Sequence, residues 1–90
     1  MNEHLTIRVY GEVQGVFYRT SAQEEAVALD LVGVISNETD GSVLIEAEGS
    51  REYLERFLEW CKAGPPSAHV TRITSTFYSD LQGYEDFVIR

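Results

Sequence analysis

The periodicity of apolar residues changes several times along this 90-residue chain, and the order of those changes constrains its fold more than any other feature. Strand-like apolar patterns are present at residues 5–9, 34–37, 42–48, 70–77 and 87–89. Helical spacing is present from about residue 18 to 31 and again over residues 54–61. The predicted order is β-α-β-β-α-β, with a short additional strand at the C-terminus. This order is typical of the ferredoxin-like α+β fold, an antiparallel sheet with two helices on one face.

The residues between these segments predict where the segments end. Gly33 is the expected end of the first helix, because glycine tolerates the left-handed backbone that often follows a helix. Thr20 and Ser21 either cap the start of that helix or lie in its first turn. The second helix is expected to stop at Gly64-Pro65-Pro66, since proline cannot continue it. Asp40-Gly41 predicts a tight turn between the second and third strands.

Length and charge narrow the range of functions. A chain of 90 residues buries only about 60–65% of its unfolded surface, so a single domain over residues 1–90 is expected. The formal net charge of −8 argues against nucleic acid and anionic membranes as partners, since both attract basic surfaces. No apolar run approaches the ~20 residues of a membrane helix, and the N-terminus lacks a signal-peptide pattern. We therefore expect a cytoplasmic protein, and we expect it to be a monomer.

The side chains that most often carry chemistry are few and isolated in this sequence. Cys61 is the only cysteine and lies on the apolar stripe of the second helix, so we expect a buried and unreactive thiol. His4 and His69 have no partner nearby in the sequence, and both are expected to lie in solvent. No Asp, His or Cys residues have the spacing of metal ligands, so neither a metal ion nor another cofactor is expected.

The most informative segment is Gly11-Glu-Val-Gln-Gly-Val-Phe-Tyr-Arg19, which joins the first strand to the first helix. Its glycines allow close approach to the backbone, and loop N–H groups beside a helix N-terminus suit an anion. Arg19 adds a planar set of charged donors that matches phosphate oxygens. A plain strand–helix connection with a surface arginine is the other interpretation of such a loop. On these residues alone, both interpretations stay open.

The full string resembles the signature of the acylphosphatase family, Gly-x-Val-Gln-Gly-Val-x-aromatic-Arg. A second stretch, Gly33-Val-Ile-Ser-Asn37 followed by Asp40-Gly41-Ser-Val43, is similar to the family's second motif. Gly64-Pro65 with Ala68, and Asp86-Phe87-Val88-Ile89 at the end, also resemble the family. The resemblance covers nearly the whole chain, and it implies the ferredoxin-like fold that the periodicity predicts.

The resemblance also implies an activity, the cofactor-free hydrolysis of acyl phosphates to a carboxylate and inorganic phosphate. Arg19 would bind the phosphate through its guanidinium, and Asn37 would position the attacking water. Inorganic phosphate would be the product and a competitive inhibitor. The backbone N–H groups that would receive the phosphate belong to Gln14, Gly15, Val16, Phe17 and Tyr18.

Other interpretations of the same residues remain. Asn37 precedes a tight turn, where asparagine commonly serves local hydrogen bonding. The Gln14 amide could simply brace the loop. The alternative function is a non-catalytic anion- or partner-binding module of the same fold. The presence of both Arg19 and Asn37 favours the enzyme.

Three residues depart from the family pattern. Val34 stands where an aromatic residue is usual, and we expect it to thin the wall beside Asn37. Glu38 places a negative charge directly after Asn37, near the expected water. Glu12 occupies a loop position at which family members often have a basic residue. Both glutamates are expected to weaken phosphate binding.

Overall fold

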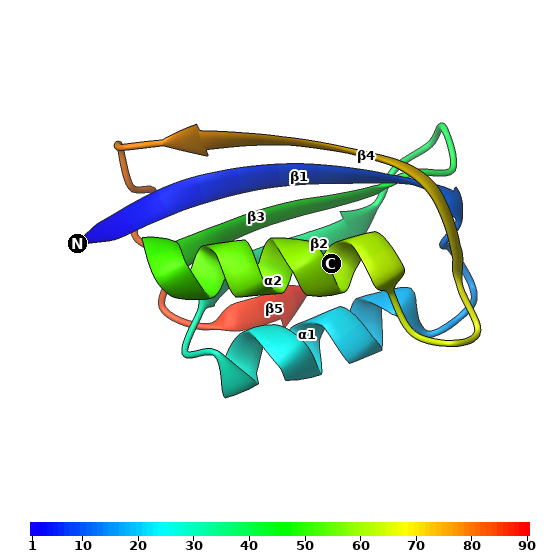
Figure 1. The fold of residues 1–90 in the computed structure, drawn as a ribbon, viewed down its shortest axis with the longest axis horizontal. Helices are drawn as coiled ribbons and strands as arrows, with labels where there is room; N and C mark the ends of the chain where they lie inside the picture. The colour runs from blue at the N-terminus through cyan, green and yellow to red at the C-terminus, as the bar shows by residue number, and fades with distance from the viewer.

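The computed structural model describes all 90 residues as a five-stranded sheet with both helices on one side of it (Figure 1). The order of strands across the sheet is β4-β1-β3-β2-β5. The predicted ferredoxin-like α+β arrangement is confirmed, and the additional C-terminal strand is present. The elements are β1 (Asn2–Glu12), α1 (Tyr18–Ala28), β2 (Val32–Asn37), β3 (Val43–Ser50), α2 (Arg51–Ala63), β4 (His69–Tyr78) and β5 (Phe87–Ile89).

The directions of the strands bring the ends of β1, β2 and β5 together. β1, β2, β3 and β4 pair antiparallel as predicted, whereas β5 pairs parallel with β2, so the sheet is mixed at that edge. Val43 of β3 lies opposite Val9 on one side and Asn37 on the other. The carboxyl ends of β1, β2 and β5 therefore lie at the same end of the sheet, where the loop after β1 begins.

The core lies between the sheet and the two helices. β1 and β3 alternate buried and less buried residues, as their sequence pattern predicts. Helix α2 packs on β1, β3 and β4, while α1 packs on β2 and β5. The thiol of Cys61 is fully buried in this core, as expected, and burial raises its pKa, which favours the unreactive neutral form. Neither helix has the length and apolar character needed to cross a membrane.

Helix α1 begins at Tyr18, as the sequence predicts, but it ends earlier than predicted. It ends at Ala28, not at Gly33, because Asp30 adopts the left-handed conformation with φ 58°. The N–H groups of Asp30 and Leu31 then donate to the carbonyls of Val27 and Ala26, a closing pattern typical of helix C-termini. At the start, the N-cap residue is Phe17 and no side chain accepts from the first turn. Thr20 and Ser21 therefore lie inside the first turn, which is the second of their two predicted positions.

Gly33 lies inside β2 and serves the sheet instead. Its φ is 153°, and a Cβ there would collide with the backbone carbonyl oxygen of Glu46 on β3. Glycine is therefore required at this position for close approach of the two strands. The prediction that Gly33 ends the helix is therefore wrong: the glycine is needed for strand contact.

The prediction that His4 lies in solvent is wrong. The residue is 5% exposed, and its ring nitrogens lie 2.6 Å from carboxylate oxygens of Glu46 and Glu48. All three side chains lie on the face of the sheet away from the helices. His69, by contrast, is exposed as expected.

Candidate active site

Residues 13–17 form the loop between β1 and α1. Gly15 and Phe17 both have positive φ angles, 73° and 63°, so the backbone turns sharply twice within three residues. None of the backbone N–H groups of residues 14–17 donates a hydrogen bond within the protein. The first N–H groups of α1 follow directly, and these have no partner inside a helix. The loop thus combines free N–H donors with the positive end of a helix dipole, which suits an anion.

Two side chains fix this loop to the rest of the protein. The amide Nε2 of Gln14 donates to the backbone carbonyl oxygens of Glu38 and Ser42, both at 2.8 Å. The hydroxyl of Ser67 donates to the carbonyl oxygen of Val16 at 2.6 Å. The side chain of Gln14 therefore braces the loop against the β2–β3 turn. This is the purely structural role that the sequence left open for it. Its expected contribution to phosphate binding is through the backbone N–H, and the side-chain contacts leave that group free.

Tyr18 anchors the first turn of α1 in the core. Its side chain is buried, and its hydroxyl donates a 2.6 Å hydrogen bond to the carbonyl oxygen of Cys61 on α2. Burial raises the pKa of this phenol well above its ordinary range, so the hydroxyl remains a neutral donor. The side chain of Tyr18 is therefore structural, and it sets the position from which Arg19 projects.

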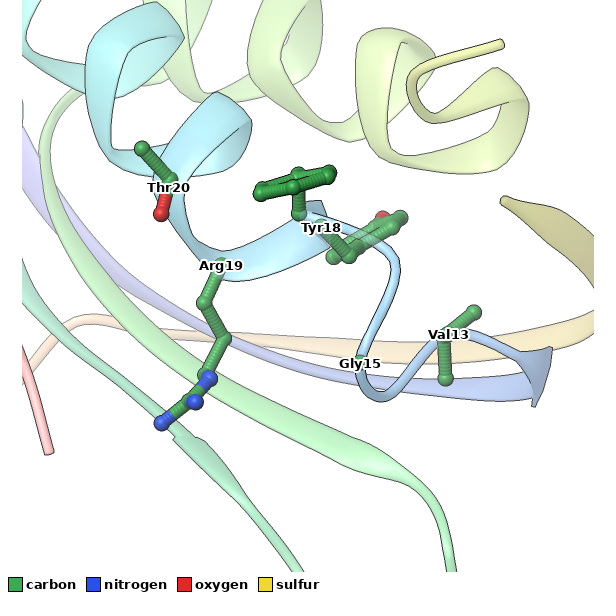
Figure 2. Close-up of a pocket in the computed structure, with 6 residues that line it drawn as sticks. Val13, Gly15, Tyr18, Arg19 and Thr20 are labelled. Carbon is green, nitrogen blue, oxygen red and sulfur yellow. The ribbon is translucent and has the colours of Figure 1, made fainter. Parts of the chain in front are cut away.

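The side chain of Arg19 extends away from α1, and Figure 2 shows it beside the loop that passes through Gly15. Its Nη1 donates a 2.7 Å hydrogen bond to the carbonyl oxygen of Arg90, which follows β5. The N–H of Arg90 in turn donates to the carbonyl oxygen of Ile35, two residues before Asn37. These contacts hold the guanidinium at the carboxyl end of β2, the end at which Asn37 lies.

Asn37 is the last residue of β2 and is exposed. It pairs with Val43, whose side chain is buried on the helix side of the sheet. Directly opposite residues share a face of a sheet, so Asn37 also projects to the helix side. Its amide makes no hydrogen bond within the protein, and the local turn bonds run between Glu38, Gly41 and Ser42 instead. The side chain of Asn37 therefore does not hold the turn, which was the alternative role that the sequence left open.

A surface depression of about 210 Å³ lies at the loop and the start of α1. Gly15, Phe17, Tyr18 and Arg19 were predicted site residues, and they contribute to its lining (Figure 2). Gln14, Val16 and Asn37 do not line it. Two further residues line it without having been predicted as site residues: Val13, which lies within the motif, and Thr20, which directly follows it.

Two of the three departures from the family pattern, Val34 and Glu38, have surroundings that differ from what the sequence suggested. Val34 does not form a wall beside Asn37, because it pairs with Glu46 on the face away from the helices. Glu38 lies 3.5 Å from the guanidinium of Arg8, which offsets its charge. Glu12 is exposed at the end of β1 and forms no ion pair, so its charge is the one that stays uncompensated.

Comparison with known proteins identifies the family. The family model for acylphosphatase matches residues 5–89. The chain is 45% identical over 86 residues to an acylphosphatase of Thermotoga petrophila, covering 96% of this chain and 94% of that protein. It is 41% identical over 81 residues to an acylphosphatase of Mannheimia succiniciproducens, covering 90% of each. The crystal structure of an acylphosphatase from Bacillus subtilis matches with a TM-score of 0.95 and 40% identity, covering all of this chain and 99% of that one. The chain therefore belongs to the acylphosphatase family of enzymes, as its two motifs predicted.

Proposed function

We propose that residues 1–90 act as one catalytic domain that hydrolyses acyl phosphates to a carboxylate and inorganic phosphate. A water oxygen attacks phosphorus, a new P–O bond forms, and the bond between phosphorus and the acyl oxygen breaks. The carboxylate leaves with the bond's electron pair, and a phosphoryl oxygen takes the proton of the water. Phosphoryl transfer of this kind depends chiefly on positioning and charge stabilisation.

The observation that carries the proposal is the set of free donors at one end of the sheet. The N–H groups of residues 14–17 have no acceptor within the protein, and they lie beside the N-terminus of α1. The guanidinium of Arg19 is held near the end of β2 by the carbonyl of Arg90. Together these groups would surround the three terminal phosphate oxygens, and they would stabilise charge that develops on those oxygens during transfer.

The proposed role of Asn37 follows from its position and its free amide. It lies at the end of β2 on the helix side, and its side chain has no partner within the protein. An amide that offers both a donor and an acceptor can orient a water toward phosphorus. A carboxylate leaves readily without acid assistance, and the phosphate accepts the water's proton. The proposed chemistry therefore uses no metal ion and no other cofactor.

The test is the release of inorganic phosphate from benzoyl phosphate by the purified protein. Arg19→Gln removes the proposed phosphate ligand and is expected to lower kcat/KM by on the order of 10²–10³-fold. Arg56→Gln is the matched control, because Arg56 is an exposed arginine of α2 whose contacts are a 3.9 Å pair to Glu52 and a cation–π contact with Tyr53. Activity is expected to survive exhaustive chelation with EDTA.

Three results would contradict parts of this proposal. Phosphate binding without turnover would favour a non-catalytic anion-binding module. A folded Arg19→Gln variant with full activity would remove Arg19 from the site. Loss of activity with EDTA that a divalent cation restores would contradict the metal-free chemistry.

A further inference from the structure

The backbone of Phe17 is held in an unfavourable conformation for its residue type. Its φ and ψ are 63° and 18°, in the left-handed region, immediately before α1. For a bulky L-residue this conformation is uncommon, whereas glycine and asparagine adopt it readily. The same position is the N-cap of α1, yet Phe17 offers no side-chain cap. Asparagine would satisfy both local requirements better.

The side chain of Phe17 is also unusual, because it is 76% exposed. The chain has four phenylalanines, and the other three are packed. Phe57 and Phe87 are in the core and contact each other edge to face, and Phe77 lies under the guanidinium of Arg51. Phe17 makes no comparable ring contact within the protein. The carbonyl oxygen of Phe17 accepts a hydrogen bond from the N–H of Ser21, but any residue could supply that group. Neither the left-handed conformation of Phe17 nor its exposed ring stabilises the folded protein.

The position of this ring relates it to the proposed substrate. Phe17 lines the same depression as Gly15 and Arg19. Its own N–H is one of the free donors of the loop, so a phosphate bound there would lie next to its backbone. The acyl group is joined to that phosphate through a single oxygen. The apolar ring of Phe17, on the residue whose N–H would contact the phosphate, is thus placed to meet the acyl group.

We propose that Phe17 is a specificity-determining residue whose ring packs against the acyl group and favours acyl phosphates with large apolar or aromatic acyl groups. This inference rests on the proposed function for the choice of substrate. Burial of the ring against such a group would compensate for its exposure in the free protein. A small acyl group such as acetyl reaches little of the ring and gains little from it.

The experiment compares aromatic and small ligands in the wild type and in Phe17→Asn. Asparagine keeps the left-handed backbone accessible while it removes the ring. The ratio of kcat/KM for benzoyl phosphate to that for acetyl phosphate is expected to fall by about 3- to 10-fold in the variant. Tyr53→Asn is the control, because Tyr53 is an exposed aromatic residue at the start of α2, at the opposite end of the sheet. It is expected to leave the ratio unchanged.

A binding measurement separates this inference from the proposed catalysis. Phenacylphosphonate and acetonylphosphonate carry a methylene in place of the bridging oxygen, so they cannot be hydrolysed in the same way. The ratio of their Kd values, measured by calorimetry, is expected to change in Phe17→Asn by the same factor. If the wild type hydrolysed neither substrate but preferred phenacylphosphonate, and Phe17→Asn lost that preference, the role of Phe17 would stand and the proposed enzyme activity would be refuted. An unchanged ratio for both ligand pairs, with both affinities lowered together, would make Phe17 a structural part of the phosphate loop and overturn the inference.

Discussion

The imidazole Nδ1 of His4 lies 2.6 Å from a carboxylate oxygen of Glu48, and both residues are buried on the face of the sheet that carries no helix. Glu48 also accepts hydrogen bonds from the backbone N–H groups of Gln82 and Gly83. These two residues belong to the segment 79–86, which connects β4 at one edge of the sheet to β5 at the other. The His4–Glu48 pair thus fastens this connection to the sheet.

The pair predicts a pH-dependent contribution to stability. Burial lowers the pKa of His4, but hydrogen bonds to Glu48 and Glu46 and the charges of both raise it above its ordinary value of 6.5. Burial raises the pKa of Glu48, whereas hydrogen bonds from Gln82, His4 and Gly83 lower it below its ordinary value of 4.5. The His4 contribution is complete below pH 6.5 and is lost as the pH rises through the raised pKa. The Glu48 contribution is complete above pH 4.5 and is lost as the pH falls through the lowered pKa.

His4→Gln is therefore expected to lower the free energy of unfolding most between about pH 4.5 and 6.5, by about 1.5–3 kcal/mol. The difference from the wild type should shrink as the pH rises toward 9. Urea unfolding across this range measures it. His69→Gln is the control, because His69 is exposed, and it should show no such pH-dependent difference. A His4→Gln difference that is constant from pH 5 to 9 would show that His4 contributes only as a neutral hydrogen-bonding group.

This cluster illustrates how far the sequence predicted the fold. The apolar alternation at residues 42–48 correctly predicted β3, and the same alternation puts Glu46 and Glu48 on the face away from the core. The burial of that face at His4 comes from the segment 79–86, which is distant in sequence and has no periodic pattern of its own. Local periodicity describes which face a strand residue occupies, but it contains no information on a connection that later crosses that face.

Gln14 leads to the second prediction. Its Nε2 donates to two carbonyl oxygens of the β2–β3 turn, so Gln14→Glu would place an acceptor, and a negative charge, against two acceptors. We expect Gln14→Glu to lower the free energy of unfolding by about 1–3 kcal/mol and to lower kcat/KM, with a larger loss than in Gln14→Ala. Gln23→Glu is the matched control: its Nε2 donates to the carbonyl oxygen of Phe87, away from the loop. It should lose stability without the matching loss in kcat/KM. Equal effects of Gln14→Glu and Gln14→Ala would mean that the two hydrogen bonds contribute little.

The candidate site shows the same division between local and distant information. The motif identified the loop and Arg19, because glycines and an arginine within nine residues are a local signal. The partner of Arg19 is the carbonyl oxygen of Arg90, 71 residues away, and it depends on β5 pairing parallel with β2. A backbone carbonyl has no residue type, so no sequence pattern could have identified it.

Asn37 provides the third prediction. Its amide has no partner within the protein, and its proposed ligand is the attacking water, so its effect should arise mainly in the transition state. Asn37→Ala is expected to lower kcat by on the order of 10²–10³-fold while changing the inhibition constant of inorganic phosphate far less. Thr39→Ala, in the same turn and exposed, controls for general disturbance of that turn. If phosphate inhibition weakened as much as kcat fell, Asn37 would be a phosphate ligand or a structural residue.

Glu12 gives the last prediction, and it depends on a charge that the structure leaves uncompensated. Glu12 is exposed, forms no ion pair, and directly precedes Val13, which lines the depression. An acyl phosphate carries about two negative charges at neutral pH, and it must approach a protein whose net charge is −8. For charges about 8 Å apart in water, each pair costs about 0.5 kcal/mol before screening by salt. Two substrate charges double this cost, and reversal of the charge at residue 12 doubles the change again, to about 2 kcal/mol or ~30-fold without salt. The ions of the assay buffer screen part of this change.

Glu12→Lys is therefore expected to raise kcat/KM by several-fold to ~10-fold at low ionic strength, mostly through a lower KM. The gain should shrink toward ~0.15 M salt, where the Debye length is about 8 Å. Glu85→Lys changes the net charge by the same amount from the segment that precedes β5, at the end of the sheet away from Asn37. Because its charge lies farther from the phosphate, its gain at low salt should be smaller than that of Glu12→Lys.

The measurement is kcat/KM for the wild type, Glu12→Lys and Glu85→Lys at low and at physiological salt. Equal gains in the two variants would assign the effect to net charge alone. No gain in Glu12→Lys would leave the loop N–H groups and Arg19 as the only determinants of phosphate affinity.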